Sequence, residues 1–370
     1  MSDKLNKFVL MSLSISLLAL QGTTIATAAE DETQKLAKAD ELLTKGKPKP
    51  AAALLREIIR SNPNNAQAHM EMGKALAGMD DTNYQQAIAE EQEALRLDPK
   101  SYGARRVLGK IYANQHKLPE ALKLLEEARD LKPTSYSAQS DLGTAYLAAG
   151  KNDEAIAAFR KAIEIKPASV ESHVKLAVLL SKKNEYKEAI AEAKEAVKLN
   201  GKQAETHLTL ANLQLESGDY SGATEAFKAA IDANGFDSFG SKNPLTAASA
   251  LSGLGWAIAS EKDVSKDKLE EAVNDERKAI KAYPTYLPGF VRLADLLTRQ
   301  SKNKDAEAVY QGGMKLSRND PSIATPYAKF LDYTGRKDDA KALLKQVLAK
   351  TPDYKQASEA LAAIEQNKTK

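Results

Sequence analysis

Residues 136–167 read YSAQSDLGTAYLAAGKNDEAIAAFRKAIEIKP, and this stretch decides the fold. The sequence on either side aligns with it without gaps. Residues 102–133 read YGARRVLGKIYANQHKLPEALKLLEEARDLKP, and residues 170–201 read VESHVKLAVLLSKKNEYKEAIAEAKEAVKLNG, so the period is 34 residues. Self-similarity at this period is typical of a solenoid, in which each repeat packs only on its neighbours.

Each repeat has the pattern of two helices joined by a turn. Apolar residues recur every three or four positions, as at Ile156, Phe159 and Ile163, which is the spacing of one helix face. Small residues coincide between repeats, and we expect them where the two helices of one repeat cross closely. These small residues are Gly109 and Gly143 in the first helices, and Ala121 and Ala155 in the second.

Helix ends are marked at the same phase in several repeats. Proline disfavours helix in the residue before it, so we expect second helices to end before Pro99, Pro133, Pro167, Pro284 and Pro352. Ser101 and Ser135 are candidate caps of the helices that follow. Glycine is the usual residue at the end of a helix, and it recurs between the two helices at Gly46, Gly150, Gly218 and Gly335.

The pattern resembles the tetratricopeptide repeat. The best copy has Leu142-Gly143, Tyr146, Ala155, Phe159, Ala162 and Pro167 at the positions of that motif. The resemblance implies an all-α fold, a right-handed superhelical solenoid of helix-turn-helix repeats. It also implies a concave groove lined by the first helix of each repeat.

We expect about nine repeats and a closing helix. The solenoid would span residues 29–354, with repeats near 32–65, 66–101, 102–135, 136–169, 170–203, 204–237, 248–286, 287–320 and 321–354. Residues 355–370 would form a capping helix and tail. The helix is expected over 356–366, with Ala357, Leu361 and Ile364 on the face that covers the apolar end of the stack.

The first residues have the three regions of a secretory signal peptide. Lys4 and Lys7 form a basic start, an apolar run covers 8–20, and Ala26-Thr27-Ala28 is a small-residue cleavage site. Thirteen helical residues span about 20 Å, less than the roughly 30 Å of a bilayer core. We therefore expect cleavage near Ala28/Ala29 and a periplasmic or secreted protein with no other membrane span. An uncleaved membrane anchor is the alternative.

Composition excludes several classes of function. The chain has no cysteine, which excludes disulfides, thiolate metal sites and cysteine nucleophiles, and which suits a bacterial periplasm. The net charge is only +3, which does not indicate a nucleic-acid partner. No catalytic motif is present, so we expect no enzyme, no cofactor and no metal. His69, His173 and His207 share one phase of their repeats and are interpreted as packing residues.

Function is expected in the groove. The positions that face it in the family place a basic cluster, Lys74, Arg106 and Lys110, in the first repeats. Such a cluster could hold an acidic group, or its charges could simply be solvated. Farther along come Asn114, Val174, Val178, Leu208, Asn212 and the only tryptophan, Trp256. Trp256 is either a core residue or an anchor for a ligand.

We therefore expect a non-catalytic scaffold or adaptor of the bacterial cell envelope, which binds a partner protein or peptide in its concave groove. The alternative is a carbohydrate-binding accessory or regulatory subunit of an envelope glycan or exopolysaccharide export system. RNA binding, which related helical repeats perform, is opposed by the near-neutral charge and the signal peptide.

Overall fold

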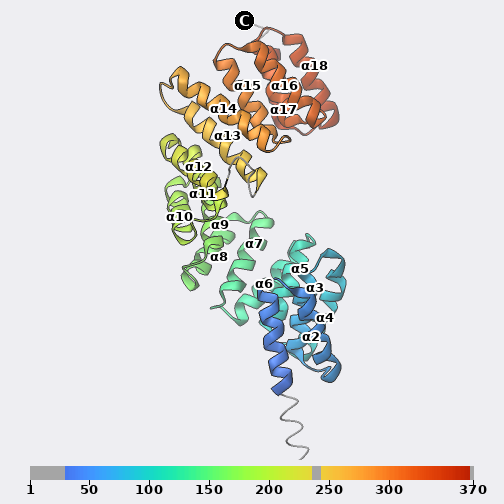
Figure 1. Ribbon diagram of the computed structural model, residues 1–370. Helices are drawn as coiled ribbons and strands as arrows, with labels where there is room; N and C mark the ends of the chain where they lie inside the picture. Colours follow the sequence, from blue (N-terminus) through green and yellow to red (C-terminus); the bar gives the residue numbers. More distant parts are fainter. Residues whose placement is uncertain (1–29, 236–242, 367–370) are drawn as a thin grey trace, which may run out of the picture. The chain divides into compact units, whose positions relative to one another are not determined.

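The computed structural model describes residues 30–235 and 243–366 (Figure 1). In these ranges the chain is helical and contains no strand, so the all-α prediction is confirmed. The predicted signal peptide, residues 1–28, lies outside the described residues. The chain divides into an N-terminal unit that ends at Pro167 and a C-terminal unit that begins at Ala168, and each is described by itself.

The N-terminal unit begins with a helix over residues 30–44. It continues with α2 (Pro48–Ser61), α3 (Ala66–Ala77), the 3₁₀ helix η1 (Asp81–Asn83), α4 (Tyr84–Leu97), α5 (Tyr102–Asn114), α6 (Leu118–Leu131), α7 (Tyr136–Ala148) and α8 (Asn152–Ile165). Helices α3 and α4, α5 and α6, and α7 and α8 pack as pairs. Each pair also packs on the next through α4 with α5 and α6 with α7, as expected of stacked repeats.

The C-terminal unit continues the same alternation of helices. Its helices are α9 (Val170–Lys182), α10 (Tyr186–Leu199), α11 (Ala204–Ser217), α12 (Tyr220–Asn234), α13 (Pro244–Ser260), α14 (Lys266–Ala282), α15 (Leu287–Arg299), α16 (Asn303–Ser317), α17 (Pro321–Tyr333), α18 (Lys337–Lys350) and α19 (Lys355–Gln366). First helices of successive repeats also touch, as α13 does α15 and α15 does α17.

Helix α13 begins at Pro244 rather than near Ala248, where the seventh repeat was expected to start. The reason is local. The Asn243 side chain accepts a hydrogen bond from the Thr246 amide at 3.2 Å, and proline fills a first-turn position that needs no amide hydrogen. The cap therefore adds a turn that the repeat alignment did not include.

The expected helix ends are confirmed. Helices α4, α6, α8, α14 and α18 each stop two residues before one of the predicted prolines. Ser101 and Ser135 accept hydrogen bonds from the amides of Ala104 and Ala138, and so cap α5 and α7. The four turn glycines adopt the left-handed backbone, with φ of 67°, 72°, 83° and 88°.

The close crossing of paired helices is also confirmed. A Cβ atom on Gly109 would lie 2.8 Å from Cγ of Leu125 and 3.2 Å from the carbonyl oxygen of Ala121. A Cβ atom on Gly143 would lie 3.0 Å from Cζ of Phe159, which is fully buried. Any larger residue at these two positions would push the helices of the repeat apart.

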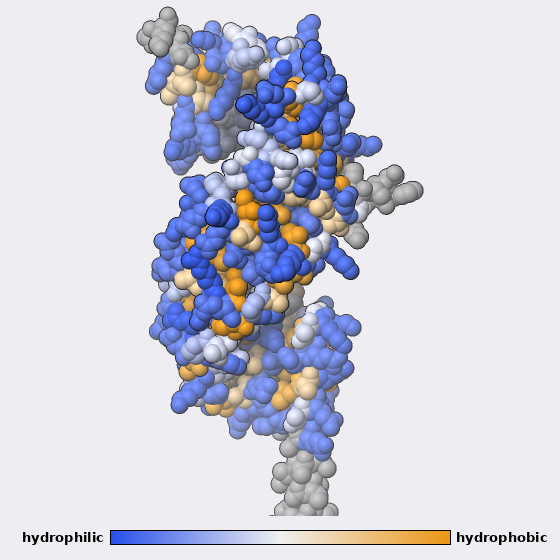
Figure 2. Space-filling view, turned by 90° about the vertical axis from the view of Figure 1, so that its left-hand side faces the viewer, coloured by the Kyte–Doolittle hydropathy of each residue, from blue (hydrophilic) through white to orange (hydrophobic). Residues whose placement is uncertain are grey.

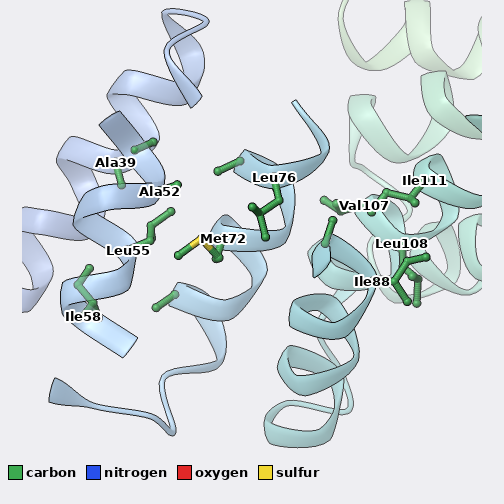
Figure 3. Close-up of a cluster of buried hydrophobic side chains, with 14 residues drawn as sticks. Ala39, Ala52, Leu55, Ile58, Met72, Leu76, Ile88, Val107, Leu108 and Ile111 are labelled. Atoms are coloured by element: carbon green, nitrogen blue, oxygen red, sulfur yellow. The ribbon is translucent and has the colours of Figure 1, made fainter. Parts of the chain in front are cut away.

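The core of the N-terminal unit runs from repeat to repeat (Figure 3). Leu55 of α2 lies beside Met72 of α3, and Leu76 of α3 and Val107 of α5 belong to the same buried cluster. Since neighbouring repeats share this cluster, no repeat buries its apolar face alone.

Helix α19 packs on α17 and α18. It buries Ala357, Ala360 and Ile364, while Leu361 is only half-buried. The predicted capping helix is therefore present, with Ala360 closer to the centre of its buried face than Leu361.

One side of the molecule is shown in Figure 2, where hydrophilic side chains predominate and apolar ones form separate patches.

Candidate functional site

Lys74, the first member of the predicted basic cluster, is half-buried on α3 and already paired. Its ammonium group lies 3.0 Å from Glu71 and 3.2 Å from Asp40. Burial lowers the pKa of Lys74, but the hydrogen bonds to Glu71 and Asp40 raise that pKa more, so the net pKa lies above its usual value. Lys74 therefore keeps its charge, but two carboxylates of the same unit share it.

Arg106 and Lys110 of α5 share one acidic partner. Nη1 of Arg106 donates to Asp141 of α7 at 2.6 Å, and Nζ of Lys110 lies 3.5 Å from the other oxygen of that carboxylate. Nδ2 of Asn114 donates to the Tyr84 hydroxyl at 3.0 Å. The predicted basic residues thus lie in one unit, and each is ion-paired within it, which removes most of the positive field that a free acidic group would meet.

A buried acid lies behind this surface. Glu91 of α4 is 0 % exposed and occupies the phase that holds Leu125 and Phe159 in the next two repeats. Burial raises the pKa of the Glu91 carboxyl to about 10, and the nearby charge of Glu71 adds to the rise while Arg106 opposes it. Glu91 is therefore neutral at pH 7 and does not act as a further acidic partner for the cations.

The predicted apolar positions lie on two adjacent first helices of the C-terminal unit. Val174 and Val178 are on α9, and Leu208 and Asn212 are on α11, which packs against α9. Val174 and Leu208 are half-buried, Asn212 is exposed, and Val178 is 39 % exposed. These four side chains give α9 and α11 a mixed face in which Val178 is the most exposed large apolar group.

Trp256 of α13 is half-buried and lies in a cationic setting. The guanidinium carbon of Arg292 is 5.7 Å from the centre of its ring, and that of Arg299 is 4.9 Å away. Both arginines belong to α15, the first helix of the next repeat. Each distance is within the range of a cation–π contact, so Trp256 is at a surface and not in an apolar core.

Trp256 lines a cavity with a volume of about 580 Å³. Three first helices, α13, α15 and α17, supply nearly all of its lining, and α16 adds one tyrosine. The lining residues are Trp256, Val291, Arg292, Asp295, Thr298, Arg299, Tyr310, Pro326, Lys329, Phe330 and Tyr333. We call this the aromatic cavity.

The floor of the aromatic cavity is an aromatic cluster. The ring centre of Tyr310 lies 5.3 Å from that of Tyr327 and 5.5 Å from that of Phe330. Burial raises the pKa of Tyr310 well above its usual value, so the phenol stays neutral. At the rim, Tyr333 is 71 % exposed, more than any other large apolar residue of the described chain.

A second buried acid lies behind the aromatic cavity. Glu276 of α14 is 0 % exposed and occupies the same repeat phase as Glu91. Burial raises the pKa of Glu276 to about 8; the positive charge of Arg292 and the Ser252 hydroxyl oppose the rise, and the nearby Asp275 adds to it. At neutral pH Glu276 is mostly uncharged, so it leaves the charge of Arg292 available to the cavity.

Sequence reasoning found Trp256 but missed the rest of this cavity. The signal was present, because the groove-facing phase that gave Trp256 continues into the last two repeats. There it gives Val291, Asp295 and Lys329, all of which line the cavity. Tyr310 comes from a second helix, and that phase could not have found it.

Three histidines, His69, His173 and His207, contact groups in or next to their own repeats. Nδ1 of His69 lies 2.6 Å from Glu90, and Nδ1 of His173 lies 2.6 Å from Glu192, in both cases on the second helix of the same repeat. Nε2 of His207 lies 2.9 Å from the carbonyl oxygen of Gly201. In residues 30–235 and 243–366, no three histidine and acidic side chains are grouped so that they could hold a metal ion.

Comparison with protein families matches this repeat geometry. One tetratricopeptide repeat model matches residues 78–144, 182–238 and 297–364, together more than half of the chain. The chain belongs to the tetratricopeptide repeat family. A second tetratricopeptide repeat model matches residues 36–102, and a model described as a TPR repeat matches 143–184. A comparison with curated proteins found no significant match.

Two solved structures share this fold over more than half of the chain. The pilF structure from Pseudomonas aeruginosa is 21% identical, with a TM-score of 0.50, over 56% of this chain and 94% of that one. The APC/C hetero-tetramer Cut9-Hcn1 is 18% identical, with a TM-score of 0.50, over 86% of this chain and 59% of that one. MamA from Desulfovibrio magneticus RS-1 is 25% identical over 46% of this chain and 94% of that one, with a TM-score of 0.39.

None of the helices described here is both long enough and apolar enough to cross a bilayer.

Proposed function

We propose that this chain is a non-catalytic scaffold of the bacterial cell envelope that holds a partner protein against the first helices of its repeats. The observation that carries the proposal is the aromatic cavity, where first helices of three consecutive repeats bring aromatic and arginine side chains together. Tryptophan, tyrosine and arginine are the residues that contribute most to binding energy at protein interfaces. The cavity is therefore the anchor point that we propose for the partner.

Two observations support a binding role over catalysis. The two carboxyl groups whose pKa values are raised most, Glu91 and Glu276, are both 0 % exposed, so neither reaches a substrate. A catalytic acid or base must come within hydrogen-bond reach of the reacting group. Three of the four charged residues that line the cavity are arginine or lysine, which suit recognition of an anion better than proton transfer at pH 7.

The envelope location in this proposal rests on the sequence. The basic, apolar and small-residue regions of residues 1–28 support export, and the absence of cysteine is typical of a chain that needs no oxidative folding.

The carbohydrate-binding alternative calls for aromatic rings with faces open to a sugar. Tyr333 is an exposed ring, but Trp256 already carries two guanidinium groups near its ring. The cavity therefore supports a protein partner better, and a glycan becomes an outcome to be measured.

Photo-crosslinking in intact bacteria tests the proposal. The crosslinking amino acid p-benzoylphenylalanine would replace Tyr333 at the cavity rim, and the control would carry it at Lys345, an exposed position on α18 away from the cavity. We expect one or two envelope proteins to crosslink from position 333 only, to a chain that starts near Ala29. Equal capture from both positions, or a cytoplasmic chain that retains residues 1–28, would contradict the proposal.

A further inference from the structure

The charges around the aromatic cavity do not balance. Its lining contains three cations, Arg292, Arg299 and Lys329, and one acid, Asp295. Nε of Arg299 pairs with the Asp295 carboxylate at 2.9 Å. Two positive charges, on Arg292 and Lys329, remain without a carboxylate partner in the cavity. The cavity therefore attracts an anion, whereas Lys74, Arg106 and Lys110 of the N-terminal unit are paired with acids of that unit.

Arg292 is held in position before any ligand arrives. Its Nη1 donates to the Ser252 hydroxyl at 3.0 Å, and its guanidinium lies 5.7 Å from the Trp256 ring centre. Ser252 and Trp256 stand on α13 and Arg292 on α15, so two helices fix the group. A cation that is already ordered loses little side-chain entropy when it binds a carboxylate.

The remainder of the lining is apolar. Its apolar and aromatic members are Val291, Pro326 and Phe330, together with the buried Tyr310 and the exposed Tyr333. Thr298 offers a hydroxyl, but it donates to the carbonyl oxygen of Ala294 at 2.8 Å within its own helix. Most of the surface that the lining exposes to the cavity is apolar, so a large apolar side chain suits it better than a sugar with many hydroxyl groups.

We propose that the aromatic cavity binds an acidic segment of the partner polypeptide, in which carboxylates pair with Arg292 and Lys329 and a neighbouring large apolar side chain contacts the aromatic lining. This inference rests on the proposed function and names the partner chemistry at the same site. It also places recognition in the last three repeats, and not at the basic cluster of Lys74, Arg106 and Lys110, whose charges are paired within the chain.

Selection from a peptide library tests this chemistry without knowledge of the partner. The full-length chain would be used to select from random twelve-residue peptides displayed on phage. We expect enrichment of Asp or Glu next to Leu, Ile, Phe or Trp. A selection that enriches no sequence class, or one that is not acidic, overturns the proposal.

Affinity measurements on the best selected peptide then test the site itself. Lys329→Glu reverses an exposed charge of the cavity, Tyr333→Ser removes the exposed ring, and Lys345→Glu is the matched control on α18. By fluorescence anisotropy, we expect the first two variants to raise Kd by about threefold to tenfold and the control to change it by less than about twofold. We also expect the affinity to fall as salt is added. Equal affinities for all four proteins would overturn the proposal.

A uronic-acid oligosaccharide added as competitor separates the two sources of carboxylate. If the oligosaccharide displaces the labelled peptide at a concentration similar to or lower than that of unlabelled peptide, the peptide proposal is overturned in favour of a glycan.

The photo-crosslinking result is independent of these measurements. If position 333 captures an envelope protein but the cavity variants bind acidic peptide normally, the inference fails and the proposed function stands. If position 333 captures no protein, the proposed function fails.

Discussion

The buried carboxyl of Glu276 should make the C-terminal unit less stable as pH rises. Its pKa is about 8 in the folded chain against an ordinary value of 4.5, because burial penalises the charged form. The unfolded chain therefore releases this proton near pH 4.5, while the folded chain keeps it until about pH 8. Between these values the folded state holds one more proton, so the free energy of unfolding falls as pH rises; above about pH 8 the loss is complete.

The size of the effect follows from the pKa difference. Between the two pKa values, each pH unit lowers the free energy of unfolding by about 1.4 kcal/mol. The decrease between pH 5 and pH 7 is therefore about 2 to 3 kcal/mol. Glu276→Gln has no proton to hold and should lose this slope. Between pH 5 and pH 7, the free energy of unfolding of the variant should therefore rise relative to that of the wild type by about 2 to 3 kcal/mol. The buried amide can add a difference that does not depend on pH, and this difference does not affect the slope.

Urea unfolding followed by tryptophan fluorescence measures this directly. Trp256 is the only tryptophan and stands on α13, which packs against α14, so the signal reports the unit that contains Glu276. Glu271→Gln is the matched control, because Glu271 is an exposed carboxyl on α14. Parallel pH profiles for wild type and Glu276→Gln would refute the claim that this carboxyl is buried and protonated.

The remaining predictions concern other positions of the repeats. Gly313→Ala should destabilise by about 1 to 3 kcal/mol, because its Cβ would clash with Ile323 and lie 3.1 Å from Phe290. Gly312→Ala would meet only Phe290, at an ordinary contact distance of 4.0 Å, and should stabilise by about 0.5 to 1 kcal/mol. Thermal melts that rank the two variants the other way would contradict the assigned packing of α16. His116 has φ of 57°, so His116→Gly should raise the free energy of unfolding in urea by about 0.5 to 1 kcal/mol, and a loss of stability would argue against the left-handed turn. Glu91→Gln should slow hydrogen exchange in α3 and α4 relative to the wild type, after correction for intrinsic exchange rates, and the difference should grow from pH 5 to pH 8. A ratio of wild-type to variant exchange rates that stays constant over this pH range would mean that Glu91 is ionised in the folded chain.

The fold could be predicted from the sequence because its determinants are local and repeated. The crossing at Gly143, the cap at Ser101 and the stop before Pro133 depend on residues within one repeat, and each recurs with the period. The start of α13 could not be predicted from the period, because Asn243 and Pro244 belong to a segment that no other repeat contains.

The candidate site was harder to predict because it depends on neighbouring repeats. Lys74 and Arg106 look like free cations in the sequence, but their partners Asp40 and Asp141 lie about one repeat away along the chain. The protonation of a buried carboxyl depends on three-dimensional burial, which the residue type does not reveal.

The aromatic cavity needed the three-dimensional structure for the same reason. It combines side chains from three first helices and one second helix, so no single phase of the repeat contains it. Trp256 was predicted as a groove residue, and its surroundings became visible only with α15 and α17 in place.

The most direct test of the central claim is a hydrogen-exchange footprint of the captured partner on the full-length chain. Binding to the first helices predicts slower exchange in α13, α15 and α17, with the strongest protection around the aromatic cavity. It predicts little change in α14 and α18. Protection confined to α14, α16 and α18, or no protection in the C-terminal unit, would contradict the account.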